Sequence, residues 1–203
     1  MPKDGSSTRE KILEAAQRLI FQRGFAGVSI DSIIEQVGIT KGAFFYHFKT
    51  KNDLAHALIG RFAQIDQEIF EEFTARSEKL SRDPLQQLLI YIGLFEEMFD
   101  DMSELYPGCL FASYVYELQQ FDDKTQEFIK TSFLRWRAEM LAQLEKITEE
   151  YPPKIEVDLP ALADTFTCTL EGGFIIAKGV GDPKAIPQQL RQFKNYIELL
   201  FSK

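Results

Sequence analysis

Apolar residues recur along this chain at the three- and four-residue spacing of helices that bury one side. The stretch Ser7-Thr8-Arg9-Glu10 has the form of a capping box, and the apolar positions of residues 12–20 follow it at helical spacing. Gly24 is suited to end that helix. Ser29 and Thr40 each precede a shorter stretch with the same pattern. We therefore expect three short helices near the N-terminus, the second capped by Ser29 and the third by Thr40.

The remainder of the chain predicts six further helices, and no stretch has a convincing strand pattern. Proline and glycine mark most of their ends. The expected helices run from Lys51 or Asn52 through Phe73, from Asp83-Pro84 through Phe99, from Cys109 to about Gln119, from Asp122 or Asp123 to about Glu150, from Leu159-Pro160 to about Gly179, and from Pro183 or Pro187 to Phe201. The pattern predicts an all-α fold of about nine helices.

The third expected helix is short and strongly two-sided. Phe44 and Phe48 are expected to pack inward, while the opposite side offers hydroxyl, ammonium and imidazole donors. A short helix that follows a tight turn and presents donors for phosphates and base edges is what a helix-turn-helix requires of its second helix. Thr40 can cap this helix, or its hydroxyl can reach a base or a phosphate, and the sequence leaves both roles open.

Charge is distributed unevenly along the 203 residues, whose formal net charge is −8. The first 60 residues hold eight Lys or Arg and six Asp or Glu, whereas the remainder holds 15 and 25. An acidic body repels non-specific DNA while a mildly basic head docks on it. Ordinary surface variation would produce the same asymmetry, so charge supports a separate DNA-facing head only together with the helix pattern.

Composition restricts the class of protein. The 45% hydrophobic residues and 18 Phe exclude a disordered chain, and no apolar run approaches the roughly 20 residues that span a bilayer. The N-terminus has no apolar segment typical of a secretory signal, so we expect a soluble cytoplasmic protein with reduced cysteines. No metal-ligand cluster, phosphate loop or nucleophile motif is present, which predicts a protein that is not an enzyme and needs no cofactor or metal.

The first 60 residues resemble the TetR family of bacterial transcriptional regulators. The resemblance covers about a quarter of the chain and rests on these segments: Thr8–Leu13, Gly24-Phe25, Val28–Ile30, Val37–Gly42 and Phe48–Leu54. It implies a helix-turn-helix DNA-binding domain at residues 1–50 and a ligand-binding and dimerisation domain at residues 51–203, joined by the long fourth helix. It also implies a homodimer on a double-stranded, pseudo-palindromic DNA operator, with no membrane partner.

The same resemblance assigns DNA contacts. Lys41 is expected to reach a guanine edge or a phosphate, and Tyr46 and His47 to donate to phosphates. Phe45 stands where many members carry a tyrosine whose hydroxyl binds the DNA backbone, so that contact is absent here. The complete expected set of DNA-binding positions is Ser29, Thr40, Lys41, Gly42, Ala43, Phe45, Tyr46, His47 and Lys51.

The resemblance places the subunit interface in the last two helices. Gly172-Gly173 would let two helices cross closely, although a crossing within one chain explains the pair equally simply. The expected interface residues are Phe166, Leu170, Gly173, Phe174, Ala177, Leu190, Phe193, Ile197 and Leu200.

The body is expected to enclose a pocket for a small apolar or aromatic ligand, because its helices carry many aromatic residues. The alternative is that these residues are ordinary core. The candidate lining is Phe62, Phe95, Met98, Phe99, Phe111, Tyr114, Phe133, Trp136, Met140 and Phe166.

The sequence thus predicts a repressor that leaves its operator when a small molecule enters the body. Cys109, near a helix start, is a candidate redox residue for an alternative, a repressor that senses electrophiles or oxidants. Cys168 is expected to be structural. A different class of function, a small-molecule carrier without operator recognition, remains a further alternative.

Overall fold

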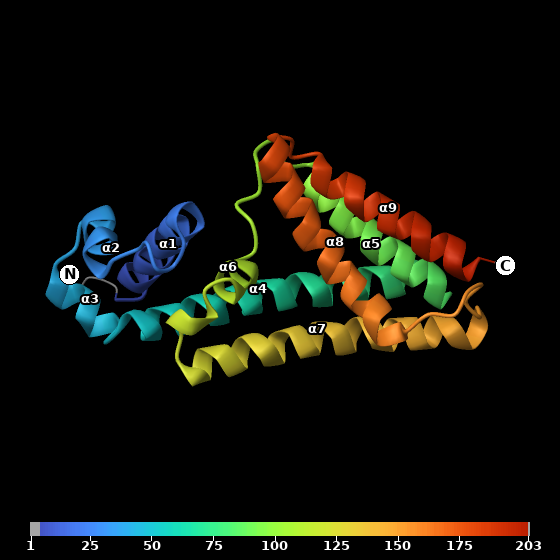
Figure 1. Ribbon diagram of the computed structural model, residues 1–203, viewed down its shortest axis with the longest axis horizontal. Coiled ribbons are helices and arrows are strands. Elements are labelled where there is room, and N and C mark those ends of the chain that lie inside the picture. Colours follow the sequence, from blue (N-terminus) through green and yellow to red (C-terminus); the bar gives the residue numbers. More distant parts are fainter. Residues whose placement is uncertain (1–4, 203) are drawn as a thin grey trace. The chain divides into compact units, whose positions relative to one another are not determined.

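The structure, a computed structural model, describes residues 5–202 and is helical through most of them (Figure 1). Nine α-helices, one short 3-10 helix and no strand occur in this range, which confirms the predicted all-α fold. The helices are α1 (Gly5–Arg23), α2 (Ile30–Val37), α3 (Lys41–His47), α4 (Lys51–Leu80), α5 (Pro84–Asp100), α6 (Leu110–Val115), η1 (Leu118–Gln120), α7 (Asp123–Glu150), α8 (Leu159–Val180) and α9 (Ala185–Phe201).

The chain packs as two compact units. Unit 1 comprises the residues up to Ile65 together with Cys109–Thr131, and unit 2 comprises Asp66–Gly108 together with the residues from Ser132 onward. The helices α4 and α7 are each divided, with one part in unit 1 and the other in unit 2. Packing therefore groups α6 and η1 with the N-terminal helices, whereas the functional division expected after residue 50 stays a prediction.

In unit 1, α1 supplies the central core. Its Ile12, Leu13 and Ala16 are fully buried, and α1 packs against α2 and α6. The helix ends as the sequence predicts, because Gly24 adopts a positive φ of 72° and its N–H donates to Ile20 O at 2.8 Å. A residue with a side chain would be strained at that φ.

Three predicted helix boundaries are wrong in detail. Ser7 lies inside α1 rather than capping it, because Gly5 and Ser6 continue the helix by half a turn. The short helix after Cys109 ends at Val115 and is followed by η1. Pro187 lies in the first turn of α9, where its missing N–H has no helical partner to lose.

Unit 2 is built around α9, which packs against both α5 and α8 (Figure 1). A Cβ on Gly173 of α8 would meet Ile186 Cα of α9 at 3.3 Å, so the glycine permits a close crossing of these two helices. Glu96 of α5 accepts hydrogen bonds from Arg191 at 2.7 Å and Lys194 at 2.6 Å, which ties α5 to α9. Because both cations share this carboxylate, the pKa of Glu96 lies below its usual value although burial opposes the shift.

Candidate nucleic-acid interface

The turn between α2 and α3 is defined by local hydrogen bonds. Ser29 caps α2, with its Oγ accepting from Ser32 N at 3.1 Å and Ser32 Oγ accepting from Ser29 N at 3.2 Å. Gly38 ends α2 with a φ of 72°. Thr40 Oγ1 then accepts from Ala43 N at 3.2 Å and caps α3. The capping role predicted for Thr40 is thereby confirmed, and its O–H remains a donor.

The two sides of α3 differ as predicted. Phe44 is 0% and Phe48 3% exposed, so these rings anchor α3 to its own unit. On the other side Tyr46 is 76% exposed, and Lys41 is also exposed. The Lys41 ammonium lies 3.4 Å from an Asp31 carboxylate oxygen, but both groups are in solvent and such pairs stabilise a protein little.

Gly42 lies open on the exposed side of α3. A methyl group at this position would have Thr40 Oγ1, at 3.9 Å, as its nearest neighbour outside the backbone of its own helix. The fold therefore does not require glycine here. The DNA-binding role expected for Gly42 and Ala43 stays a prediction, and substituting Gly42 tests it without disturbing the fold.

Lys51 has an additional contact within unit 1. Its Nζ donates to Phe25 O and lies 4.0 Å from the centroid of the Phe25 ring, and its expected role in binding DNA stays a prediction. Burial lowers the pKa of Lys51, while the charge of Glu117 acts in the opposite direction. Phe45 is half-buried with its ring 5.5 Å from Phe44. His47 is also half-buried and packs edge-on against Tyr46 at 5.0 Å.

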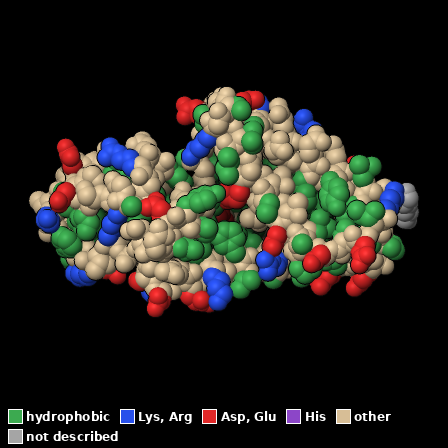
Figure 2. Space-filling model, viewed as in Figure 1, with side chains coloured by type: hydrophobic (Ala, Val, Ile, Leu, Met, Phe, Trp, Pro, Cys, Tyr) green, Lys and Arg blue, Asp and Glu red, His purple; other side chains and the backbone are tan. Residues whose placement is uncertain are grey.

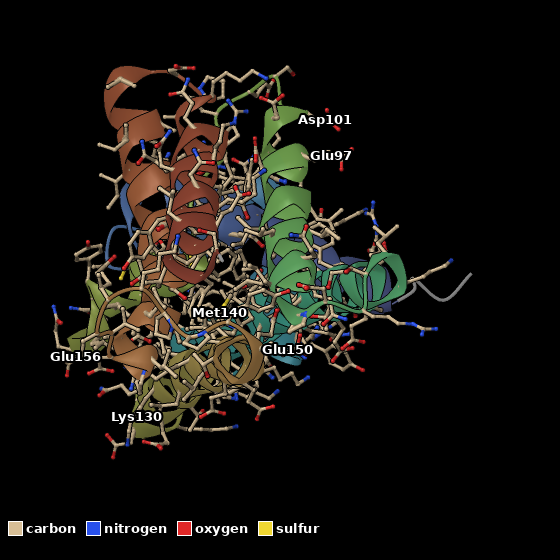
Figure 3. The ribbon with its side chains drawn as sticks, turned by 90° about the vertical axis from the view of Figure 1, so that its right-hand side faces the viewer. Glu97, Asp101, Lys130, Met140, Glu150 and Glu156 are labelled. Atoms are coloured by element: carbon tan, nitrogen blue, oxygen red, sulfur yellow. The ribbon has the colours of Figure 1, made fainter. Side chains whose placement is uncertain are left out.

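The aromatic residues expected to line one pocket are divided between the units. Phe62, Phe111 and Tyr114 belong to unit 1, where Tyr114 O–H donates to Ala55 O at 3.4 Å. Phe111 and Tyr114 are fully buried there. The other candidates belong to unit 2: Phe95, Met98, Phe99, Phe133, Trp136, Met140 and Phe166. Figure 3 shows Met140 among enclosed side chains, whereas Glu97, Asp101 and Glu156 lie at the periphery.

Within unit 2, Phe95 of α5 is the centre of an aromatic cluster. Its ring centroid lies 5.3 Å from that of Phe166 on α8 and 4.8 Å from that of Phe73 on α4. Phe70 and Tyr91 complete the cluster at 5.6 and 5.2 Å. Phe70, Phe73 and Tyr91 are not among the pocket residues expected from the sequence, although Tyr91 lies one helical turn before Phe95.

A half-buried carboxyl group lies on the same face of α4 as Phe70 and Phe73. Asp66 is one helical turn before Phe70, and burial, reinforced by the charge of Glu171, raises its pKa to about 7. Arg135 acts in the opposite direction but weakly. The adjacent Gln67 donates to Glu71 Oε1 at 2.7 Å, while nothing among the described residues donates to its buried Oε1. The interior thus has acceptors that sequence reasoning missed.

The expected interface residues are mostly core of their own chain. Leu170 is half-buried, and the other eight are buried: Phe166, Gly173, Phe174, Ala177, Leu190, Phe193, Ile197 and Leu200. The apolar face that the pattern identified packs α9 against α8 and α5, and the assignment of these residues to a subunit interface stays a prediction. The single-chain crossing explains Gly173.

The opposite faces of α8 and α9 are exposed and partly apolar. Ile175, Ile176 and Val180 of α8 are 59%, 49% and 67% exposed, and Tyr196 and Leu199 of α9 are 40% and 69% exposed. Figure 2 shows hydrophobic side chains at the surface over the right-hand part of its view, where α9 lies in Figure 1. A groove of 380 Å³ between these helices is lined by Thr165, Cys168, Thr169, Gly172, Gly173, Ile176, Gln189, Gln192, Phe193 and Tyr196.

The two cysteines are not in a disulfide and lie in different settings. Cys109 is half-buried at the start of α6, so its role as a redox residue stays a prediction. Cys168 is exposed in the groove just described, which corrects the expectation that it is structural. No helix among residues 5–202 is long and apolar enough to cross a membrane.

Comparison with known proteins agrees with this geometry. Residues 12–58 match the family described as bacterial regulatory proteins, tetR family. An uncharacterised HTH-type transcriptional regulator from the lacX 3' region of Lactococcus lactis subsp. lactis is 24% identical over 200 residues, which are 97% of this chain and 96% of that protein.

Solved structures extend the similarity over the whole fold. A TetR-family transcriptional regulator from Agrobacterium tumefaciens is 26% identical, with a TM-score of 0.76 over 98% of this chain and 100% of its own. A TetR transcriptional regulator from Chloroflexus aurantiacus is 22% identical and matches in fold, with a TM-score of 0.79 over 98% of both chains. All three of these proteins are described as transcriptional regulators.

Proposed function

We propose that this chain, which belongs to the TetR family of transcriptional regulators, is a homodimeric repressor that a small molecule releases from its operator. In this proposal residues 1–50 bind DNA and residues 51–203 bind the ligand and the second subunit. The observation that carries it is α3, where Phe44 and Phe48 are buried while Lys41, Gly42 and Tyr46 are presented to solvent. A rigid short helix with an unused polar side is suited to a major groove.

Dimerisation is supported by the outer faces of α8 and α9. A single helix-turn-helix contacts too little DNA for operator-level specificity, and two-fold partners place recognition helices roughly 34–36 Å apart in successive major grooves. Isoleucine and tyrosine side chains exposed beside a groove form a surface that water solvates poorly. A second copy of the same surface would cover it.

The ligand proposed is aromatic or apolar, in keeping with the rings around Phe95. Asp66 and the buried Oε1 of Gln67 add acceptors near the α4 part of this cluster, so a ligand that also carries a hydrogen-bond donor is favoured. Binding there would release the operator only if the ligand prefers the DNA-free conformation of the dimer, because a ligand that binds both states equally shifts nothing.

The test is fluorescence anisotropy of the purified protein on labelled DNA that flanks its own gene, with scrambled competitor and a salt series. Binding that survives excess competitor supports the proposal and supplies the assay for an inducer screen. If DNA fragments that cover the whole locus bind only weakly and scrambled DNA competes equally well, the result would favour a small-molecule carrier instead. Mass spectrometry of material extracted from the protein would then identify a carried ligand.

A further inference from the structure

The corner between α1 and α2 is held by a residue distant in sequence. Glu117, at the start of η1, accepts from Phe25 N through Oε1 at 2.7 Å and from Ala26 N through Oε2 at 2.7 Å. Both oxygens of one carboxylate are thus used on two consecutive backbone N–H groups. Such pairs of N–H groups form anion-binding concavities, and their bonds to a carboxylate are stronger than neutral ones.

The backbone of the corner is shaped for this contact. Gly24 has a φ of 72°, and a Cβ at that position would lie 2.7 Å from Glu117 Oε1. Any side chain there would therefore collide with the carboxylate, in addition to straining the backbone. Gly24 serves two purposes at once, since it ends α1 and leaves room for Glu117.

Aromatic packing joins the same two segments. The Phe25 ring lies 4.5 Å from Phe121 and 5.7 Å from Tyr114, and Tyr114 stacks on Phe121 at 4.2 Å. Lys51 closes the corner from the α4 side through its contacts with Phe25. The segment 109–131 is consequently part of the folded head, although it lies some 60 residues beyond α3 in the sequence.

We propose that Glu117 is a positioning residue for DNA recognition, acting through the corner at Phe25 and Ala26 rather than by touching DNA. The inference rests on the proposed DNA-binding function. The corner is followed at once by Ser29, which caps α2, and α2 leads through a three-residue turn into α3. Fixing the corner fixes where α2 starts, and hence how α3 is presented.

The contact between Glu117 and the α1–α2 corner also provides a way for a change in unit 2 to affect the helix-turn-helix. The segment 109–131 is continuous in the chain with unit 2 at Gly108 and at Ser132. A rearrangement that pulls on this segment therefore acts on the α1–α2 corner through the Glu117 carboxylate. Loss of the contact would leave the part-buried Phe25 N–H without its acceptor, which makes the contact a costly one to break.

The test is Glu117→Gln in the full-length protein, assayed on the operator and on scrambled DNA. Electrostatics alone predicts slightly tighter binding to both, because one negative charge is removed. If Glu117 positions the helix-turn-helix, operator affinity should instead fall about tenfold, while affinity for scrambled DNA should be unchanged or slightly higher. The matched control is Glu127→Gln, which removes an exposed carboxylate of the same unit that pairs with Lys130.

Amide hydrogen exchange supplies the second readout. If Glu117 positions the corner, the Phe25 and Ala26 amides should exchange faster in Glu117→Gln, while the amides in the core of α1 stay protected. Faster exchange throughout α1 would show general loss of folding and overturn a positioning role. Gly24→Ala disrupts the same contact by displacing the Glu117 carboxylate. The double variant Gly24→Ala/Glu117→Gln should therefore lose little more operator affinity than the weaker-binding of the two single variants.

The outcomes separate the two proposals. Failure of the wild-type protein to bind any operator would count against the proposed function. Wild-type operator binding that Glu117→Gln leaves as tight as Glu127→Gln would overturn the positioning role alone.

Discussion

The helices α3 and α9 follow the same amphipathic rule and leave opposite kinds of surface. Each buries aromatic residues, Phe44 of α3 with Phe48 directly after it, and Phe193 of α9. The outer side of α3 carries hydroxyl and ammonium donors, whereas that of α9 is partly apolar, with Tyr196 and Leu199 exposed among polar residues such as Gln192. A surface of separated donors suits a hydrated, charged polymer, and an exposed apolar surface suits another folded protein. The buried sides of α3 and α9 stabilise the fold, and their exposed sides are suited to different partners.

The strongest test of this contrast is to place a charge on the apolar outer surface. Ile176→Glu should separate the subunits, because two copies of the carboxylate would meet near a two-fold axis without a partner. Operator affinity should then fall by more than about a hundredfold, since one head alone makes half the contacts. Sedimentation equilibrium would give the oligomeric state, and anisotropy would give the affinity.

The matched control is Ile155→Glu, which changes an isoleucine that is 58% exposed outside α8 and α9. It should remain dimeric and bind the operator normally. A dimeric Ile176→Glu protein with unchanged affinity would refute the proposed interface.

A second test concerns the interior of unit 2. Burial raises the pKa of Asp66 to about 7, so between about pH 4 and pH 7 the folded protein holds a proton that the unfolded chain releases. Stability is therefore expected to fall as the pH rises from about 4 to 7, by roughly 4 kcal/mol at most. Asp66→Asn should remove this dependence and be more stable than the wild type at pH 8.

Urea unfolding between pH 5 and pH 8 measures the effect. The control is Asp164→Asn, which changes a surface carboxylate in a bidentate pair with Arg137 and should keep the pH profile of the wild type. If the wild type and Asp66→Asn show the same pH profile, the Asp66 carboxyl is not the cause.

The helix boundaries of the helix-turn-helix could be predicted from the sequence better than the contacts of the rest of the chain. Caps at Ser29 and Thr40 and the stop at Gly38 are local, so a few neighbouring residues determine them. The orientation of Lys51 was missed because Phe25, its partner, is 26 residues away. Glu117 was missed for the same reason, since nothing near it in sequence indicates its contact with Phe25 and Ala26.

The body shows a different limit. Apolar spacing located α8 and α9 and identified Phe166 and Phe193 as contact residues. It could not tell whether those contacts lie within one chain or between two, because burial looks the same in both cases. Asp66 was overlooked because a single acidic residue in a long helix usually faces water, and only the packing around it shows that this one does not.

The third test addresses the polar side of α3. Lys41→Ala should cost about 1–3 kcal/mol of operator binding and relax the preference for one base pair. Tyr46→Phe should cost less and weaken binding to all sequences alike, because it removes a donor to phosphate but no contact with a base edge. A set of operators with single base-pair changes, measured by anisotropy, distinguishes these outcomes. Equal loss of sequence preference in both variants would contradict the assignment.

The smallest expected effect gives the cleanest separation of folding from function. Gly42→Ala adds a methyl group that the protein itself accommodates, with its nearest neighbour at 3.9 Å. Alanine also favours a helix by about 1 kcal/mol over glycine, so thermal stability should be unchanged or higher. Operator affinity should nevertheless fall severalfold, because the methyl group occupies space that the groove floor needs. Unchanged affinity in a stabilised protein would show that α3 does not approach DNA through Gly42.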